Sequence, residues 1–381
     1  MGLKEVIANT LAPSPVYIAR STNGNGSLRP LGLREAGAYI ILNGKLPSKQ
    51  PKLILDLSGG CAKGYIHTGL LIRLYTAGIE FDEARLISVA NFVPVLEKTK
   101  DVKKFKDFSL EIPELIKPKS KTSLGKLADV VTHSRKSHFS NGEPVITHNG
   151  LYNTEKLEAR LKQIYGDDTT GQYPKYHMLA MAILDEKTSR LVDLSVDYSK
   201  MPMVTASIGA ISIPTIFPFV RYKGVLIQDA GYICNFPFEM KHLSDADTVI
   251  AVNLSYNAKC PPKSNYGGVE GIFINQQVQG QVRDRRYTEK VVQETTGITP
   301  EDLANRTIVF GPKVAIALPQ TDDIPPGEIY IPPKRRLELI AQGEALGEKV
   351  LKMFRQPTVS FYIPFLNRYS ANGKGRSNGH G

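Results

Sequence analysis

The apolar residues of this chain gather into short continuous runs that alternate with stretches of helical periodicity, a pattern typical of α/β proteins. The clearest unit starts with Leu53–Leu57, which is almost wholly apolar. The glycine-rich segment Ser58–Gly64 follows, and apolar side chains between Ile66 and Ala77 then share one helical face, with Gly78 in the position of a helix cap. This stretch predicts a buried strand, a tight turn and a helix.

A second strand is expected at Ala84–Ile87, followed by Ser88 and a helix over Val89–Lys98 that contains Pro94. Two strands joined by a helix form a βαβ crossover, which indicates a parallel sheet. Further strands are expected at Tyr176–Leu184, Arg190–Leu194, Val225–Gln228, Thr248–Leu254, Thr307–Phe310 and Val314–Leu318, and further helices at Leu151–Tyr165, Val204–Ala210 and residues 335–354.

These elements predict one α/β domain over residues 51–355, with flanking segments of different texture. Residues 1–50 are rich in Gly, Asn, Ser and Pro and are interpreted as an N-terminal arm; residues 356–381 form a C-terminal extension with a disordered tail. Within the domain, residues 98–140 contain eleven Lys or Arg against five Asp or Glu. This basic insertion is either a solvated loop or a segment that docks on anionic lipid, and the sequence leaves both open.

Composition adds one constraint. The chain has 381 residues, with ordinary apolar and charged fractions of 41% and 22%, but its net charge of +11 favours an anionic partner such as a phospholipid surface or a nucleic acid. Nucleic acid is the weaker interpretation, because Trp is absent and no basic motif is interleaved with aromatic residues.

Cysteines and targeting signals place the protein in a reducing compartment. Cys61, Cys234 and Cys260 form no CxxC pair, which argues against a zinc site, and no other metal or cofactor is expected. No apolar run reaches the length of about 18 residues that a membrane span requires, and the first residues lack a signal-peptide pattern. We therefore expect a cytoplasmic protein that contacts membranes only peripherally.

The turn Ser58–Gly64 has the character of an anion-binding site, since backbone N–H groups and a helix N-terminus both favour negative charge. A bound phosphate is one possibility, although neither GxxxxGK[ST] nor GxGxxG is present. The transient oxyanion of acyl transfer is a second. A purely structural turn is the third, and this stretch alone does not decide among them.

Two polar residues follow predicted strands directly. Ser88 stands between a strand and a helix, as the serine of a nucleophile elbow does, and Asp229 ends the strand Val225–Gln228. The carboxyl ends of parallel strands share one sheet edge, so both residues and the glycine turn are expected to meet there. A carboxylate beside a serine can act as its general base, whereas an isolated Asp or Ser at such a place is often only structural.

Taken together and in order, these segments resemble the patatin-like phospholipase family. Ser58–Gly69, SGGCAKGYIHTG, is similar to the family's SGGGAKG-type oxyanion segment, and Leu86–Ala90 occupies the GxSxG position. Asp229-Ala230-Gly231 occupies the DGG/DGA position and is followed by Tyr232–Pro237, similar to the NNxP run. Ile211–Pro218 is similar to the stretch that precedes the aspartate. The resemblance extends over roughly residues 50 to 350.

The resemblance implies a three-layer α/β/α sandwich with a mostly parallel central sheet. It also implies a phospholipase A-type lipid acyl hydrolase, a serine esterase with a catalytic dyad and no histidine. Ser88 would attack the ester carbonyl of a membrane lipid and Asp229 would take its proton. Gly59, Gly60 and Cys61 would supply the oxyanion hole, with Lys63 in the family's Arg/Lys position.

The sequence also departs from the family pattern. Cys61 replaces the third glycine, and Leu86 and Ala90 replace the glycines of GxSxG, so Leu86 is expected to crowd the elbow; Pro94 is expected to kink the following helix. These changes support an alternative: a weakened or inactive patatin-like protein that serves as a lipid- or partner-binding scaffold.

Overall fold

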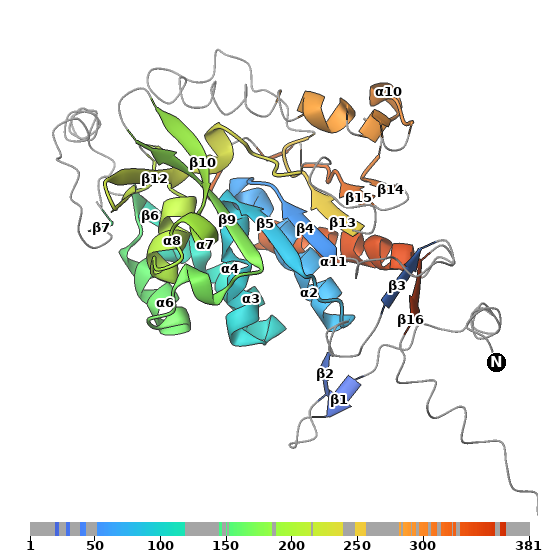
Figure 1. Cartoon of the computed structure of the whole chain (residues 1–381), viewed down its shortest axis with the longest axis horizontal. Helices are drawn as coiled ribbons and strands as arrows, with labels where there is room; N and C mark the ends of the chain where they lie inside the picture. The colour runs from blue at the N-terminus through green and yellow to red at the C-terminus, as the bar shows by residue number, and fades with distance from the viewer. Residues whose placement is uncertain are drawn as a thin grey trace, which may run out of the picture.

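In the part of the chain that the structure describes, the centre is a ten-stranded sheet with the strand order β14-β15-β13-β4-β5-β9-β12-β11-β7, and β10 lies beside β9 (Figure 1). This computed structural model describes residues 52–118, 152–184, 188–238, 248–256 and 297–354, apart from short gaps at 215, 304–305, 311–313, 322 and 325–327; it also describes residue 150, helical positions between 282 and 294, and the outlying strands given below.

The sheet is parallel in the middle and antiparallel at its edges. β15, β13, β4, β5 and β9 are joined by parallel pairs, whereas β14, β10, β12, β11 and β7 all pair antiparallel with their neighbours. The strands are β4 (Leu53–Leu57), β5 (Glu83–Ile87), β7 (Val145–Ile146), β9 (Tyr176–Ile183), β10 (Ser189–Asp193), β11 (Val220–Tyr222), β12 (Val225–Asp229), β13 (Thr248–Val252), β14 (Ile308–Phe310) and β15 (Val314–Ala317).

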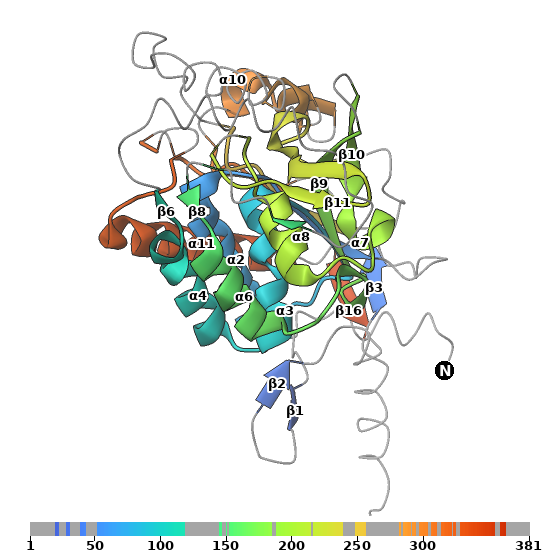
Figure 2. The same cartoon turned by 90° about the vertical axis from the view of Figure 1, so that its left-hand side faces the viewer.

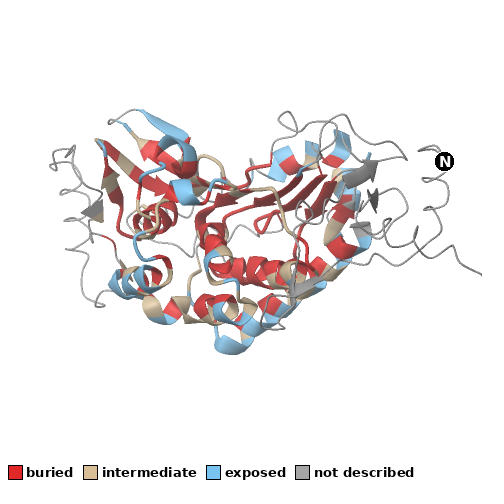
Figure 3. Cartoon of the chain, turned by 60° about the horizontal axis from the view of Figure 1, so that its bottom comes forward, coloured by how far each residue is buried: buried red, intermediate tan, exposed pale blue. Residues whose placement is uncertain are grey.

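One face of the sheet is covered by a layer of helices. The helices of this layer are α2 (Tyr65–Thr76), α3 (Pro94–Thr99), α4 (Val102–Leu115), α6 (Glu155–Tyr165), α7 (Leu194–Asp197), α8 (Met203–Ala210) and α11 (Pro333–Phe354), whereas α10 (Pro300–Leu303) lies on the opposite face. Figure 2 shows α11, α2, α4 and α6 as neighbours in this layer, and Figure 3 shows that their inner sides and the strands are buried. Leu53, Leu55 and Leu57 of β4 face these helices and belong to the main core.

Helices α2 and α11 lie unusually close because glycines form their contact. A Cβ added to Gly69 would lie 1.9 Å from the Ile340 carbonyl oxygen, and one added to Gly343 would lie 2.1 Å from the Ile66 carbonyl oxygen. Neither position can hold a larger residue without moving a helix backbone. This contact fixes α2, and with it the turn that precedes α2.

The opposite face carries a smaller core. Ile54 of β4 and Val249 of β13 pack there with Leu303 of α10 and with Val292, which lies in a helical segment. The mixed α/β fold expected from the sequence, a central sheet flanked by helices, is therefore confirmed.

Six short strands lie outside the main sheet. β1 (Arg20–Thr22) pairs with β2 (Leu28–Pro30), β3 (Tyr39–Leu42) pairs with β16 (Val359–Tyr362), and β6 (Lys117–Pro118) pairs with β8 (Tyr152–Asn153), all antiparallel. The β3–β16 pair thus joins the N-terminal arm to the C-terminal extension. The tail proposed to be disordered, Ser370–Gly381, lies outside the described residues.

One local expectation was wrong, and one of two alternatives that the sequence left open is excluded for part of its range. Pro94 does not kink a helix: Ser88–Phe92 forms a separate 3₁₀ turn, η2, and Pro94 then occupies the first turn of α3, where its missing N–H costs nothing. Residues 102–115 of the proposed insertion form α4, whose Phe105 and Phe108 are buried in the main core, so this part is not a solvated loop. Residues 119–144 of the insertion lie outside the described part.

None of the helices in the described part is both long enough and apolar enough to cross a membrane.

Candidate active site

Ser88 stands on a strained turn at the end of β5. Its φ of 55° lies in the left-handed region, which is uncommon for a residue with a Cβ and typical of a nucleophile elbow. The preceding Ile87 is still extended, and η2 begins directly at Ser88. Asn91 donates a hydrogen bond to the Ser88 carbonyl oxygen at 3.1 Å and so helps to hold the turn. The serine is only 6% exposed.

Asp229, the last residue of β12, lies against Ser88. The Ser88 side chain lies close enough to the Asp229 carboxylate to lower its pKa, and the Gly231 amide donates a hydrogen bond to Asp229 Oδ1 at 2.7 Å. Burial raises the pKa of Asp229 to about 6, and the interactions with Ser88 and Gly231 limit that rise. At neutral pH this buried carboxylate is thus ionised, yet more basic than an exposed aspartate.

The two residues meet by a route that differs from the one expected. We expected two parallel strands ending at a common edge, but β12 runs antiparallel to β9. On one side of β9, Ile87 of β5 lies opposite Leu179; on the other side, Asp229 lies opposite Ala180. Because Leu179 and Ala180 are consecutive, β5 and β12 end at the same level of β9 from opposite directions.

The glycine turn lies directly against the elbow. A Cβ added to Gly59 would lie 2.9 Å from the Ser88 Cβ and 2.5 Å from Asn235 Oδ1, so only glycine allows this approach. The Gly59 amide donates a hydrogen bond to the Asn235 carbonyl at 3.0 Å, and the Lys63 amide donates one to the Gly60 carbonyl at 3.0 Å, so both of these N–H groups are already used. Within the described residues, the Gly60 amide donates to no backbone carbonyl. Cys61, next in the chain, has a φ of 47°.

Lys63 belongs to this turn, and His67 lies just beyond it on α2. Lys63 is buried, with an exposure of 1%. The Nε2 atom of His67 lies 2.8 Å from the Ser58 carbonyl oxygen, just before the turn. Since a carbonyl oxygen only accepts, Nε2 carries the proton, and burial lowers the pKa of His67 to about 4. The ring is therefore neutral at physiological pH and ties α2 to the end of β4.

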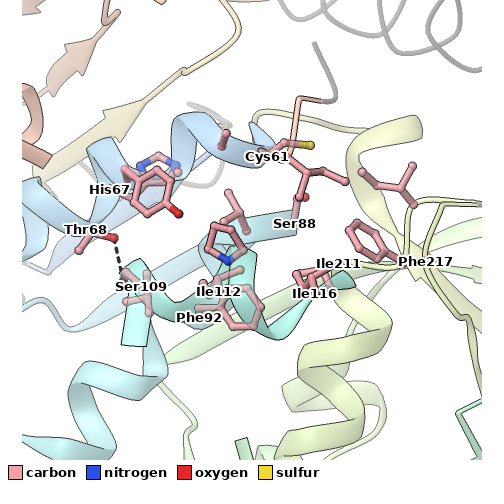
Figure 4. Close-up of a pocket in the computed structure, with 18 of the residues that line it drawn as sticks. Cys61, His67, Thr68, Ser88, Phe92, Ser109, Ile112, Ile116, Ile211 and Phe217 are labelled. Carbon is pink, nitrogen blue, oxygen red and sulfur yellow. Dashed lines mark hydrogen bonds between the residues drawn. The ribbon is translucent and has the colours of Figure 1, made fainter. Parts of the chain in front are cut away.

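A largely apolar cavity opens beside Ser88 and holds about 740 Å³ of empty space, its opening to solvent included. Its walls come from the turn, α2, η2, α4 and the segment 211–217 (Figure 4). Phe92, Phe105, Ile112, Ile211 and Phe217 supply much of its surface. Cys61 and Ser88 line the same cavity, so the serine faces an apolar space.

The sequence interpretation did not identify these wall residues. Phe105, Phe108 and Ile112 recur at helical spacing, which is the signal that could have revealed an amphipathic helix, but the surrounding lysines led to the interpretation as an insertion. Asn235 and His67 were also missed as supports of the turn. The Asn235–Gly59 contact joins segments far apart in the sequence, and the His67–Ser58 contact depends on how α2 packs against the turn, so spacing alone reveals neither.

Fold and site together define an α/β sandwich protein in which a buried serine–carboxylate pair meets a glycine turn above an apolar cavity. Comparison with known proteins adds little. No family model matches the chain, and no curated protein matches it either. Among solved structures, it is similar to VipD from Legionella pneumophila, with 13% sequence identity and a TM-score of 0.41 over 90% of this chain and 70% of that one. Likeness at this level carries no argument about function.

Proposed function

We propose that the protein is an acyl hydrolase in which Ser88 is the nucleophile and Asp229 the general base. The observation that carries this proposal is the position of Ser88, on a strained strand-to-helix turn beside the buried Asp229 carboxylate. A serine is a weak nucleophile by itself, and an adjacent base activates it by accepting the proton during attack.

The proposed reaction has two halves. In the first, Ser88 Oγ attacks the ester carbonyl carbon, its proton passes to Asp229, and the oxyanion forms next to the amides of Gly60 and Cys61. Asp229 then returns the proton to the leaving alkoxide, and an acyl-enzyme remains. In the second, a water molecule attacks this acyl group, Asp229 takes a proton from the water and passes it to Ser88 Oγ, and a carboxylic acid leaves.

The environment of Asp229 suits this role. A general base works best when its pKa lies near the operating pH, and a pKa of about 6 leaves Asp229 ionised at pH 7 while making it more basic than an exposed aspartate. The cavity is lined by apolar side chains of Phe92, Phe105 and Ile112, among others, and supports an acyl chain as the group bound beside Ser88.

We propose a lipid ester as the substrate, and phospholipase A-type chemistry as the specific activity. The apolar cavity supports the first statement, and the similarity of Ser58–Gly69, Leu86–Ala90 and Asp229–Gly231 to the patatin-like phospholipase motifs supports the second. The net charge of +11 further favours an anionic membrane surface as the place of action, with peripheral contact from the cytoplasmic side.

Release of fatty acid from mixed phospholipid vesicles tests the proposal. Wild type should release fatty acid, while Ser88→Ala and the nearly isosteric Asp229→Asn should each lose on the order of 1,000-fold or more in rate. Ser199→Ala, which removes an exposed serine hydroxyl, is the matched control and should keep full activity. Equal rates for wild type and Ser88→Ala would remove Ser88 as the nucleophile.

A non-catalytic scaffold is the second candidate, favoured by Cys61, which adopts a φ of 47° in the place of a family glycine. Leu86 does not strengthen the scaffold interpretation as expected. Its side chain is fully buried in the main core instead of crowding the elbow, and Ser88 still lies beside Asp229. Vesicle binding without fatty-acid release, unchanged in Asp229→Asn, would favour the scaffold.

A further inference from the structure

The cavity beside Ser88 has two walls that come from different elements. The helical wall, from α2 and α4, consists of Tyr65, Thr68, Phe105, Ser109 and Ile112. The loop wall, from the segment that follows α8, consists of Ile211, Ile213 and Phe217. Figure 4 shows Thr68 and Ser109 on one side of Ser88 and Ile211 and Phe217 on the other. A ligand bound at Ser88 can therefore extend in two directions.

The loop wall lies beside the proposed base. The Asp229 amide donates a hydrogen bond to the Ser212 carbonyl oxygen at 3.1 Å, which holds this segment against the end of β12. The Ser212 hydroxyl donates to the Ile208 carbonyl oxygen at 2.6 Å, whereas its neighbours Ile211 and Ile213 line the cavity. All three side chains of the loop wall are apolar and buried. The side of the cavity next to Asp229 is thus lined by hydrocarbon.

The helical wall lies on the side of the glycine turn, because α2 begins directly where that turn ends. Two of its hydroxyl groups are already paired: Thr68 donates to Ser109 Oγ at 3.1 Å, and Ser109 donates to the Phe105 carbonyl oxygen at 2.9 Å. Tyr65 adds a third hydroxyl at the start of α2. The side chains of Phe105 and Ile112 supply the apolar surface of this wall.

The proposed chemistry assigns one part of the ester to each wall. The reacting carbon of the tetrahedral intermediate has four bonds: to Ser88 Oγ, to the oxyanion, to the leaving oxygen and to the acyl chain. The oxyanion points to the amides of Gly60 and Cys61. Asp229 must return its proton to the leaving oxygen, so that oxygen lies within hydrogen-bond reach of Asp229 and next to the loop wall. The acyl chain takes the remaining direction, along the helical wall.

We infer that the loop wall binds an apolar group on the alcohol part of the ester, while the acyl chain lies along the helical wall. The inference rests on the proposed function and deepens it by naming the substrate class: an ester with apolar groups on both sides of the bond that is cleaved. A charged or hydroxyl-rich alcohol would lose its water at the loop wall and find no partner among the side chains there. Among membrane lipids, this selects diacyl lipids, whose glycerol carries a second acyl chain, over single-chain lipids.

Two series of esters test the walls separately, with kcat/KM measured by release of the carboxylic acid. The alcohol series contains the butanoate esters of methanol to octanol, and the acyl series contains the butyl esters of butanoate to decanoate. Every member of the alcohol series forms the same acyl-enzyme, so differences within it arise in binding and acylation. Ile213→Phe narrows the loop wall, and Ile112→Phe, the same substitution on the helical wall, is its matched control.

We expect the wild-type kcat/KM to rise with the length of the alcohol, by about fourfold for each methylene that becomes fully buried. Ile213→Phe should reduce this gain and leave the dependence on acyl length unchanged, and Ile112→Phe should do the opposite. If Ile213→Phe does not fold, Ile213→Ala tests the same wall, since the space that it opens should extend the gain to longer alcohols.

The outcomes separate the inference from the proposed function. Hydrolysis that does not depend on alcohol length would overturn the inference and leave the hydrolase standing, and so would loop-wall and helical-wall variants that shift the same series. If wild type hydrolyses no ester of either series, the proposed function is overturned, and the inference is overturned with it.

Discussion

Activity should fall as the pH drops through about 6, because the base must be ionised to accept the Ser88 proton. With a pKa of about 6, Asp229 is fully ionised at pH 8 but only about one-tenth ionised at pH 5. We therefore expect kcat/KM to be about tenfold lower at pH 5 than on the plateau, and to fall about tenfold for each further pH unit. An exposed aspartate, with its ordinary pKa near 3.8, would give no such loss at pH 5.

Unfolding of the protein on protonation of Asp229 does not explain such a loss of activity. The pKa of Asp229 is higher in the folded protein than in the unfolded chain, so the folded state binds more protons between pH 3.8 and about 6. This group therefore makes the fold relatively more stable as the pH falls through that range. His67 titrates lower, at about 4, and a second loss from that ring would be separate on the pH axis.

The assay is hydrolysis of a short soluble ester from pH 4.5 to 8.5, with activity re-measured at pH 7.5 after each incubation to exclude irreversible loss. Asp107→Asn removes a partly exposed carboxylate on α4 and should leave the profile unchanged. Asp229→Asn should reduce the rate and abolish the limb near pH 6. A flat wild-type profile between pH 5 and 8, or the same limb in the residual activity of Asp229→Asn, would refute the assignment of the base.

Three further predictions follow from the packing. Gly59→Ala should lower kcat/KM on the order of 100-fold, because the added Cβ would lie 2.9 Å from the Ser88 Cβ. In the same ester assay Gly231→Ala should cost far less, since the nearest atoms to its added Cβ are 3.1 Å away, and equal losses in the two variants would contradict this. Gly343→Ala should lower the free energy of unfolding, measured in urea, by more than about 2 kcal/mol, because the added Cβ would lie 2.1 Å from the Ile66 carbonyl oxygen. Ala345→Gly, at an exposed position of the same helix, should lower it by about 1 kcal/mol, and a larger loss for Ala345→Gly than for Gly343→Ala would contradict the prediction. Ile112→Phe should partly fill the cavity and shift the preferred ester toward acyl chains shorter by one or more methylenes. Each methylene that no longer fits loses about 0.8 kcal/mol of burial free energy. An unchanged chain-length profile would show that acyl chains bind elsewhere.

The sequence predicted those elements that local patterns determine. The strands at 53–57 and 248–252 are continuous apolar runs, and they appear at the expected places because such runs are buried on both faces. The antiparallel pairing of β12 with β9 could not be predicted in the same way. A strand of five residues carries no mark of whether its neighbour runs parallel or antiparallel, and that direction decides how Asp229 approaches Ser88.

The candidate site was predictable as a set of residues but not as a geometry. Ser88, Asp229 and the glycine turn each follow a strand, and that position is visible in the sequence. The cavity depends on α4, whose apolar face is masked by lysines that the structure leaves on the outside: Lys103 and Lys104 are 83% and 69% exposed. A helix with this charge on one face and Phe105 on the other is amphipathic, so net charge over a window was the wrong quantity to consider.

Backbone strain gives an independent reason to place function at this turn. Within the described residues, four residues other than glycine have positive φ: Cys61, Ser88, Lys100 and Lys223. Lys100 ends helix α3 in a left-handed cap, and Lys223 precedes Gly224 in the hairpin between β11 and β12, so ordinary turn geometry explains both.

Cys61 and Ser88 have no such local explanation, since each begins a 3₁₀ turn that could start from an extended residue. Such conformations cost about 1–2 kcal/mol per residue and persist only where surrounding contacts enforce them. Here Gly59 packs against Ser88 and Asn235, which leaves the chain no room to relax. Two strained residues that line the same cavity, one of them beside a buried carboxylate, are more readily explained by a reaction at that place than by folding alone.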